Sequence, residues 1–300
     1  MKNEINNEQI DDRYTDEALV QMLPKFKNGF ADVNGIKLHY VEGGLGAPLI
    51  LIPGWPETWW SFHKVMPGLS ERYHVVCPDL RGMGSSEKPK SGYEKKQMAA
   101  DIAALIKYFG FQKVNIAGHD IGASVAFSFA ADYPELTNKL ILIDTPPPDD
   151  SMYKLPMLPV PGYPHPWWLA FNQVKVLPEQ LLAGRMRYLL DWIFDNLLVE
   201  KSSIDDFSRA VYALNYNGID AIRASNGWYQ AFPKDIQDFK AYDKLSIPVL
   251  GIAGSGFQLL QTSLPGLTKD LKLVKLEGCG HFIQSENPAG FITAISSFLA

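Results

Sequence analysis

The sequence predicts an α/β protein built on a mostly parallel sheet that is wrapped by helices. Short runs rich in β-branched residues alternate with segments of helical periodicity along most of the 300 residues. Several of these runs are apolar throughout, which is typical of strands buried on both faces of a sheet. The alternation is interrupted once, by a proline-rich segment and a stretch without strand signals. These observations predict one α/β core that carries a helical insertion.

The first half of the chain supplies most of the predicted sheet. The predicted strands cover 36–44, 47–53, 73–80, 113–120 and 139–146. Residues 95–111 have helical spacing, and Gly110 is expected to cap the end of that helix. A second helix, built from small residues, is expected to follow the strand that ends at Asp120 and to extend to Tyr133.

The middle of the chain predicts a different architecture. From Pro146 to Pro166 the sequence carries eight prolines in 21 residues, which breaks regular structure there. Residues 178–237 then show helical patterns rich in Trp, Tyr, Phe and Leu. The strand pattern resumes at 247–254 and 271–278, before a closing helix over 288–300. We therefore expect an α/β core over 1–145 and 238–300, interrupted by a helical cap over 146–237.

Composition narrows the class of protein. Apolar residues make up 46% and charged residues 20% of the chain, an ordinary globular balance. A net charge of -5 and a pI near 5.7 show no excess of basic residues, which argues against a nucleic-acid partner. The two cysteines, Cys77 and Cys279, form neither a disulfide framework nor a metal motif and suit a reducing compartment. Without a signal-peptide pattern or an apolar run of roughly 20 residues, we expect a cytoplasmic protein with no membrane partner.

The segment Gly118-His119-Asp120-Ile121-Gly122-Ala123 lies where a predicted strand turns into a helix. Its pattern, small-x-nucleophile-x-small-small, is typical of a tight elbow, because small residues let the strand and the helix approach closely. Serine hydrolases place Ser at the centre of the elbow, whereas this chain places Asp120. An Asp at this point is also a common helix N-cap. The glycine spacing favours a nucleophile, and the absence of Ser excludes a serine esterase.

Two further residues follow strands that end at the same edge of the predicted sheet. His281 lies in a glycine-rich loop, Gly278-Cys279-Gly280-His281-Phe282, directly after the last strand. Asp144 stands at the end of the strand after the elbow helix. The other usual position for an acid, 254–256, reads Gly-Ser-Gly and has no carboxylate. A loop histidine and a turn aspartate are the ordinary alternatives, but with Asp120 these residues predict a nucleophile, a base and an acid.

These motifs resemble the α/β-hydrolase superfamily, in the branch that holds epoxide hydrolases, haloalkane dehalogenases and fluoroacetate dehalogenases. The similarity covers nearly the whole chain. It includes Gly54-Trp55-Pro56-Glu57, the run from Asp79 to Ser86, the elbow, and the His281 loop with Gln284, Glu286 and Pro288. The resemblance implies an α/β-hydrolase fold, and fluoroacetate dehalogenases place their acid where Asp144 stands here. It thus implies the triad Asp120, Asp144 and His281, with no metal and no organic cofactor.

The resemblance also assigns supporting residues. The backbone N–H groups of Trp55 and Ile121 are expected to form an oxyanion hole, although Pro53 replaces the usual His of that loop. In the insertion, Trp167 and Trp168 stand where relatives place a pair of residues that face the nucleophile and bind the substrate. The segment that ends at Tyr229 resembles the one whose Tyr protonates the oxirane oxygen in epoxide hydrolases, so Tyr229 is the expected acid. Packing within the cap is the alternative role for these three aromatic residues.

A function follows from these assignments as an expectation. A carboxylate attacks an sp³ carbon and leaves an alkyl ester, which water activated by His281 then hydrolyses. The expected substrate is a bulky, apolar epoxide that is opened to a diol. Cleavage of a carbon–halogen bond by the same triad is the alternative. Fluoroacetate dehalogenases carry Arg at the positions of Ile121 and Ser124, and its absence disfavours an anionic haloacid.

A non-catalytic ligand-binding protein on the same fold is the alternative from another class, and the complete triad counts against it. The sequence leaves open whether the chain forms a homodimer.

Overall fold

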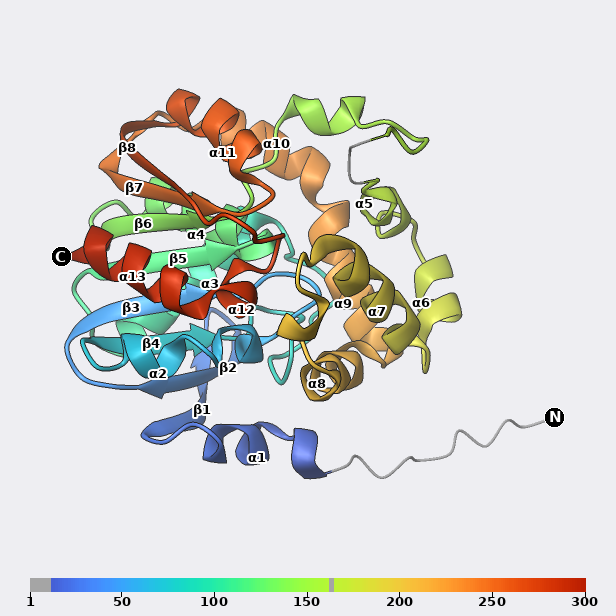
Figure 1. Cartoon of the computed structure of the whole chain (residues 1–300), viewed down its shortest axis with the longest axis horizontal. Coiled ribbons are helices and arrows are strands. Elements are labelled where there is room, and N and C mark those ends of the chain that lie inside the picture. Colours follow the sequence, from blue (N-terminus) through green and yellow to red (C-terminus); the bar gives the residue numbers. More distant parts are fainter. Residues whose placement is uncertain (1–11, 162–164) are drawn as a thin grey trace.

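A computed structural model of the chain describes residues 12–161 and 165–300. These residues form one eight-stranded sheet in the order β1-β2-β4-β3-β5-β6-β7-β8 (Figure 1). Its strands are β1 (Phe26–Val33), β2 (Ile36–Gly43), β3 (Ala47–Ile52), β4 (Tyr73–Pro78), β5 (Val114–His119), β6 (Thr137–Ile143), β7 (Leu245–Ala253) and β8 (Thr268–Lys275). The pairings from β4 to β8 are parallel, whereas β2 runs antiparallel to both β1 and β4. The predicted α/β class with a mostly parallel sheet is confirmed.

The central strands are buried on both faces, as their apolar sequences predict. β5 is buried over its whole length, and the last four residues of β3 and of β6 are buried as well. Each predicted strand agrees with an observed one to within three residues at either end. β1 was not predicted, because its sequence FKNGFADV mixes polar and apolar residues and it pairs only with β2 at the edge of the sheet.

Helices cover both faces of the sheet. In Figure 1, α3 (Lys95–Tyr108) and α4 (Ile121–Asp132) pack against each other behind it, while α13 (Pro288–Leu299) and α2 (Met66–Leu69) pack together in front. The chain leaves α3 at the cap residue Phe109. Gly110 is the next residue, has φ +72°, and donates its N–H to the Lys107 carbonyl at 3.0 Å. The predicted glycine therefore ends the helix, but it stands one residue after the cap position.

Between β6 and β7 the described residues form helices and no strand. These helices are α5 (Trp167–Phe171), α6 (Leu177–Leu182), α7 (Met186–Leu197), α8 (Asp206–Tyr216), α9 (Ile219–Gln230) and α10 (Phe232–Lys240). Most of them gather beside one edge of the sheet in Figure 1. The proline-rich segment holds one short 3-10 helix, Asp150–Lys154, while residues 162–164 of that segment lie outside the described residues. That 146–237 folds as a separate cap stays a prediction.

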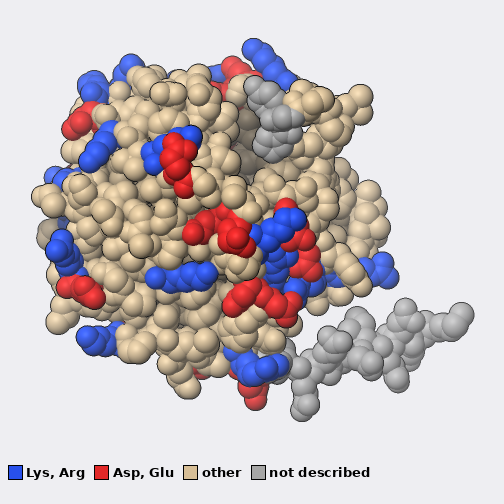
Figure 2. Space-filling view, viewed as in Figure 1, with Lys and Arg blue, Asp and Glu red and all other residues tan. Residues whose placement is uncertain are grey.

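The remaining helices are short, and none was predicted: α1 (Asp16–Gln21), α11 (Phe257–Ser263) and α12 (Ile283–Glu286). Within 12–161 and 165–300, no helix combines the length and the apolar character needed to cross a membrane. Figure 2 shows Lys and Arg side chains interspersed with Asp and Glu over the visible face. No extended basic area is visible on that face.

The register of the strands sets the position of the site. Ile52 pairs with Gly118, His119 pairs with Ile143, and Ile143 pairs with Ile252. β3, β5, β6 and β7 therefore end at one level, and the residues that follow each strand meet at the same edge of the sheet.

Candidate active site

Asp120 joins β5 to α4 in a conformation that side-chain-bearing residues rarely adopt, with φ 51° and ψ -120°. The glycines on either side make this turn possible. A Cβ on Gly118 would lie 2.1 Å from the Gly122 carbonyl oxygen, and a Cβ on Gly122 would lie 2.4 Å from that of Ile52. The elbow therefore requires glycine at both positions. It holds the Asp120 side chain partly open, with 21% of it exposed.

Two backbone N–H groups face the Asp120 carboxylate. Trp55 N donates to Oδ1 at 2.9 Å, and the N–H of Ile121 lies beside the carboxylate and favours its charged form. The loop after β3 approaches the elbow so closely that a Cβ on Gly54 would lie 2.4 Å from the Asp120 Cβ. Pro53, which replaces the expected His, is buried in this loop. The structure thus brings both expected oxyanion donors to one carboxylate.

His281 lies between two carboxylates. Its Nδ1 is 2.7 Å from Asp144 Oδ2, and its Nε2 is 3.6 Å from Asp120 Oδ2. The other oxygen of Asp144 accepts hydrogen bonds from the backbone N–H groups of Gly254 at 2.8 Å and Gly256 at 2.9 Å. The Gly-Ser-Gly segment that lacks a carboxylate therefore orients the acid instead. The sequence held no signal for this second role.

The charges of these three residues depend on one another. Burial disfavours a charged His281, but the carboxylates of Asp120 and Asp144 outweigh it and raise the pKa of His281 to about 10. Burial also opposes the charge on Asp120, yet its interaction with His281 holds the pKa of Asp120 below the ordinary value. At neutral pH Asp120 is a carboxylate beside an imidazolium. The charge on Asp120 therefore favours the protonated form of His281.

Tyr229 reaches the same place from α9. Its buried ring stands perpendicular to that of Trp55, with the ring centroids 5.6 Å apart. Burial and the nearby charge of Asp120 raise the pKa of Tyr229 well above the ordinary value, so its hydroxyl stays protonated at neutral pH. Asn172, the residue after α5, lies beside this hydroxyl and favours its ionised form. Sequence reasoning missed Asn172, because no motif marks it.

Trp167 and Trp168 lie in α5 and are half-buried. Their rings pack against Trp192 of α7, with centroid separations of 5.2 Å and 6.1 Å. Among the described residues, no hydrogen bond, ion pair or ring contact joins either indole to Asp120 or Tyr229. The Trp168 carbonyl accepts a hydrogen bond from Asn172 N at 2.8 Å, so its backbone helps to place Asn172. A role of this pair in substrate binding stays a prediction.

A second buried acid–histidine pair lies behind the His281 loop. His119 Nε2 is 2.9 Å from the His281 carbonyl oxygen, and its Nδ1 is 3.3 Å from Glu57 Oε2. Gln284 Nε2 donates to the same Glu57 oxygen at 3.2 Å. Burial raises the pKa of Glu57. These contacts hold the backbone of His281 rather than its imidazole, so Glu57 does not share the orienting role of Asp144.

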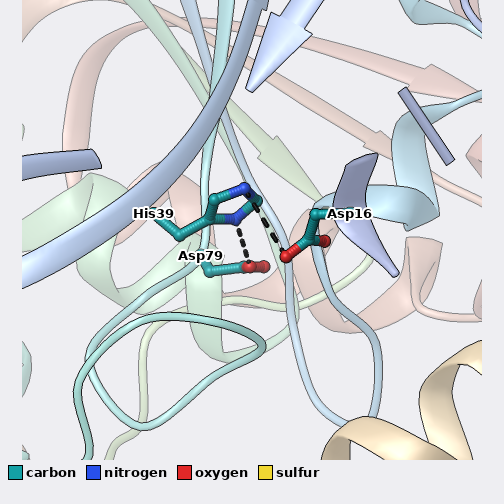
Figure 3. A group of neighbouring side chains, drawn as sticks. All are labelled: Asp16, His39 and Asp79. Atoms are coloured by element: carbon teal, nitrogen blue, oxygen red, sulfur yellow. Dashed lines mark hydrogen bonds and ion pairs between the residues drawn. The ribbon is translucent and has the colours of Figure 1, made fainter. Parts of the chain in front are cut away.

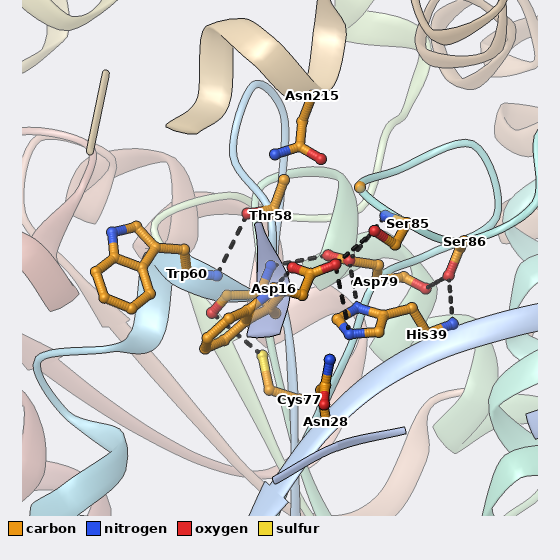
Figure 4. Close-up of polar contacts among 12 residues, drawn as sticks. Asp16, Asn28, His39, Thr58, Trp60, Cys77, Asp79, Ser85, Ser86 and Asn215 are labelled. Atoms are coloured by element: carbon orange, nitrogen blue, oxygen red, sulfur yellow. Dashed lines mark hydrogen bonds and ion pairs between the residues drawn. The ribbon is translucent and has the colours of Figure 1, made fainter. Parts of the chain in front are cut away.

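Asp16, His39 and Asp79 form a separate titratable cluster (Figure 3). His39 Nδ1 is 2.8 Å from Asp79 Oδ2, and its Nε2 is 3.6 Å from Asp16 Oδ2. All four carboxylate oxygens already accept hydrogen bonds, from His39, Trp59 and Ser85 (Figure 4). A metal ion would have to displace these donors. We therefore assign the cluster to anchoring α1 against β2 and the loop after β4.

Comparison with known proteins gives this geometry a context. Residues 47–288 match the family model described as alpha/beta hydrolase fold. The chain is 33% identical to the soluble epoxide hydrolase of Corynebacterium sp. (strain C12) over 285 residues, which cover 90% of this chain and 96% of that enzyme. It is 30% identical to the fluoroacetate dehalogenase of Burkholderia sp. over 168 residues, 54% of this chain and 55% of that enzyme. The solved structure of the ligand-free epoxide hydrolase CorEH superposes with a TM-score of 0.82 at 31% identity, covering 91% of this chain and 98% of that one.

Proposed function

Because this chain belongs to the α/β-hydrolase family and is a hydrolase, we propose that it opens epoxides to diols through an alkyl ester on Asp120. The observation that carries the proposal is a carboxylate at the elbow, held by two backbone N–H groups and 3.6 Å from His281. Similarity to epoxide hydrolases over most of the chain supports the choice of an epoxide. Asp144 is the acid that holds His281, and Tyr229 is the proton donor.

The first step forms the ester. An Asp120 carboxylate oxygen attacks an oxirane carbon, and the carbon–oxygen bond of the ring breaks. The departing oxygen takes the proton of the Tyr229 hydroxyl, because an alkoxide is a poor leaving group unless it is protonated as the bond breaks. The lowered pKa of Asp120 and the raised pKa of Tyr229 keep both groups in the form that this step needs.

The second step hydrolyses the ester. Neutral His281 takes a proton from water, and the hydroxide adds to the Asp120 carbonyl carbon. The oxyanion that forms accepts hydrogen bonds from the N–H groups of Trp55 and Ile121, the same groups that hold the free carboxylate. The intermediate then collapses: the bond between the Asp120 carbonyl carbon and the diol oxygen breaks, and that oxygen takes the proton of the added hydroxyl, which releases the diol and restores the Asp120 carboxylate. Asp144 fixes the His281 ring and stabilises its imidazolium.

Protons balance over the two steps. The ester has no charge, so the pKa of His281 falls once Asp120 is alkylated and His281 gives up a proton. That proton replaces the one that Tyr229 delivered to the substrate. His281 regains a proton from the attacking water, and the free state returns. The base is thus made available by the first chemical step.

Carbon–halogen hydrolysis with the same triad is the second candidate, and the similarity to a fluoroacetate dehalogenase favours it. The residue after the nucleophile is Ile121, and Ser124 follows one turn later. Both are buried and uncharged, so neither position offers a cation for a haloacid carboxylate. An anionic haloacid is therefore disfavoured as the substrate. The substrate expected for this second candidate function is a neutral organohalide.

A panel of terminal, styrene-type and cyclic epoxides with matched organohalides tests the proposal. Diol and free halide are measured for the wild-type protein and for Asp120→Ala. We expect diol from at least one class of epoxide and none above background from Asp120→Ala. Halide release without diol would favour the second candidate. Diol formation that persists in Asp120→Ala would contradict the assigned nucleophile.

A further inference from the structure

Three buried side-chain N–H groups have no hydrogen-bond partner among the described residues, two of them in residues that lie beside Tyr229 and the third in the same helix as Tyr229. They are the indole Nε1 of Trp55 and the amide Nδ2 groups of Asn172 and Asn226, and we call them the donor cluster. The three residues are 3%, 1% and 2% exposed, respectively. Most buried donors in native proteins have a partner, so a buried donor without one in the chain is expected to bond to a water molecule or a ligand.

The donor cluster lies around Tyr229. The Trp55 ring is perpendicular to the Tyr229 ring, 5.6 Å away. Asn172 lies beside the Tyr229 hydroxyl and favours its ionised form, although the geometry between them does not complete a hydrogen bond. Asn226 precedes Tyr229 by three residues in α9, which places both side chains on one face of the helix. Because the Trp55 backbone also donates to Asp120, the cluster lies next to the reacting carboxylate.

We propose that the donor cluster binds a hydrogen-bond acceptor, such as a carbonyl oxygen, which the substrate carries next to its oxirane ring. This inference rests on the proposed function and refines its substrate from a purely apolar epoxide to an oxygenated one, such as an α,β-epoxy ketone. Tyr229 donates to the oxirane oxygen, so N–H groups packed around it face an oxygen only a few bonds away. The cluster donors are uncharged, which suits a neutral acceptor rather than an anion.

Equilibrium binding of two inert ligands tests the donor cluster without turnover. Benzylacetone and butylbenzene share one carbon skeleton and differ only in the ketone. Trp55→Phe removes the indole N–H but keeps a ring and the backbone donor to Asp120, and Asn172→Leu removes the amide at nearly constant shape. In each variant we expect the Kd of benzylacetone, measured by calorimetry, to rise about 3- to 10-fold relative to that of butylbenzene. Asn196→Leu, at an exposed position of α7, is the matched control and should leave the ratio unchanged.

The outcomes separate the two proposals. A ratio of Kd values that stays constant in both variants would overturn the donor cluster as a binding site. Turnover is then measured with benzylideneacetone oxide and the matching 1-phenylbutene oxide. A shifted binding ratio without diol from either oxide would uphold the donor cluster and contradict epoxide hydrolysis. If Asn172→Leu does not fold, Trp55→Phe decides alone.

Discussion

Replacing Asp120 with Asn should lower the pKa of His281, because it removes a negative charge 3.6 Å from His281 Nε2. At that distance the attraction between two unit charges is about 1 kcal/mol in bulk water and roughly 4–5 kcal/mol at an effective dielectric constant of about 20. One pKa unit corresponds to about 1.4 kcal/mol, so the expected decrease is about one to three units. Starting from a pKa of about 10, His281 in the variant should titrate between roughly 7 and 9.

The assay is an NMR titration of the histidine side chains in the wild-type protein and in Asp120→Asn. The chain has six histidines, and His281→Phe identifies the resonance that belongs to His281. Asp243→Asn removes an equal charge at an exposed position and serves as the control. The same charge loss occurs when Asp120 is esterified, so the variant reports the state in which His281 acts as the base. A decrease smaller than the bulk-water value of about one unit, or an increase, would refute this account of the pair.

Two substitutions test the remaining assignments of the site, and a third tests the buried ion pair between Lys95 of α3 and Asp235 of α10, in which Nζ lies 2.7 Å from Oδ2. Asp144→Asn should slow ester hydrolysis by a factor on the order of 10²–10⁴, so that the ester accumulates in rapid-quench mass spectra; full activity would exclude Asp144 as the acid. Tyr229→Phe should cost roughly 10²–10⁴-fold in alkylation by an epoxide and less with a matched organohalide, whereas equal small losses would make Tyr229 a packing residue. Lys95→Met should lower the free energy of unfolding by about 3–5 kcal/mol, because it leaves Asp235 buried without its partner. Adding Asp235→Leu should recover part of that loss in denaturant titrations.

The sequence predicts best those features that depend on local pattern. Strands β3 and β6 follow from runs of apolar residues, and the elbow follows from Gly118 and Gly122, whose close contacts exclude any side chain. The order of Asp120, Asp144 and His281 along the chain fits parallel strands that end at one level. Edge strand β1 was not predicted, because several of its side chains are exposed and its sequence mixes polar and apolar residues.

Features that depend on contacts between distant segments could not be predicted. The N–H groups of Gly254 and Gly256 orient Asp144, which is more than a hundred residues away in the sequence. No sequence spacing predicts a contact between residues so far apart. Asn172 follows a helix of five residues just after the proline-rich segment, and so short a helix shows little periodicity in the sequence. The resemblance to relatives assigned Trp167 and Trp168 to substrate binding, whereas in the structure both rings pack against Trp192.

The most direct test of the central claim is intact-protein mass spectrometry of His281→Phe after incubation with an epoxide that the wild-type protein hydrolyses. Without the base, the ester should form and persist, so the mass should rise by the mass of the epoxide. Peptide mapping should place the added mass on Asp120. An adduct on another residue, or no adduct while the wild-type protein turns the same epoxide over, would contradict the assignment of Asp120 as the nucleophile.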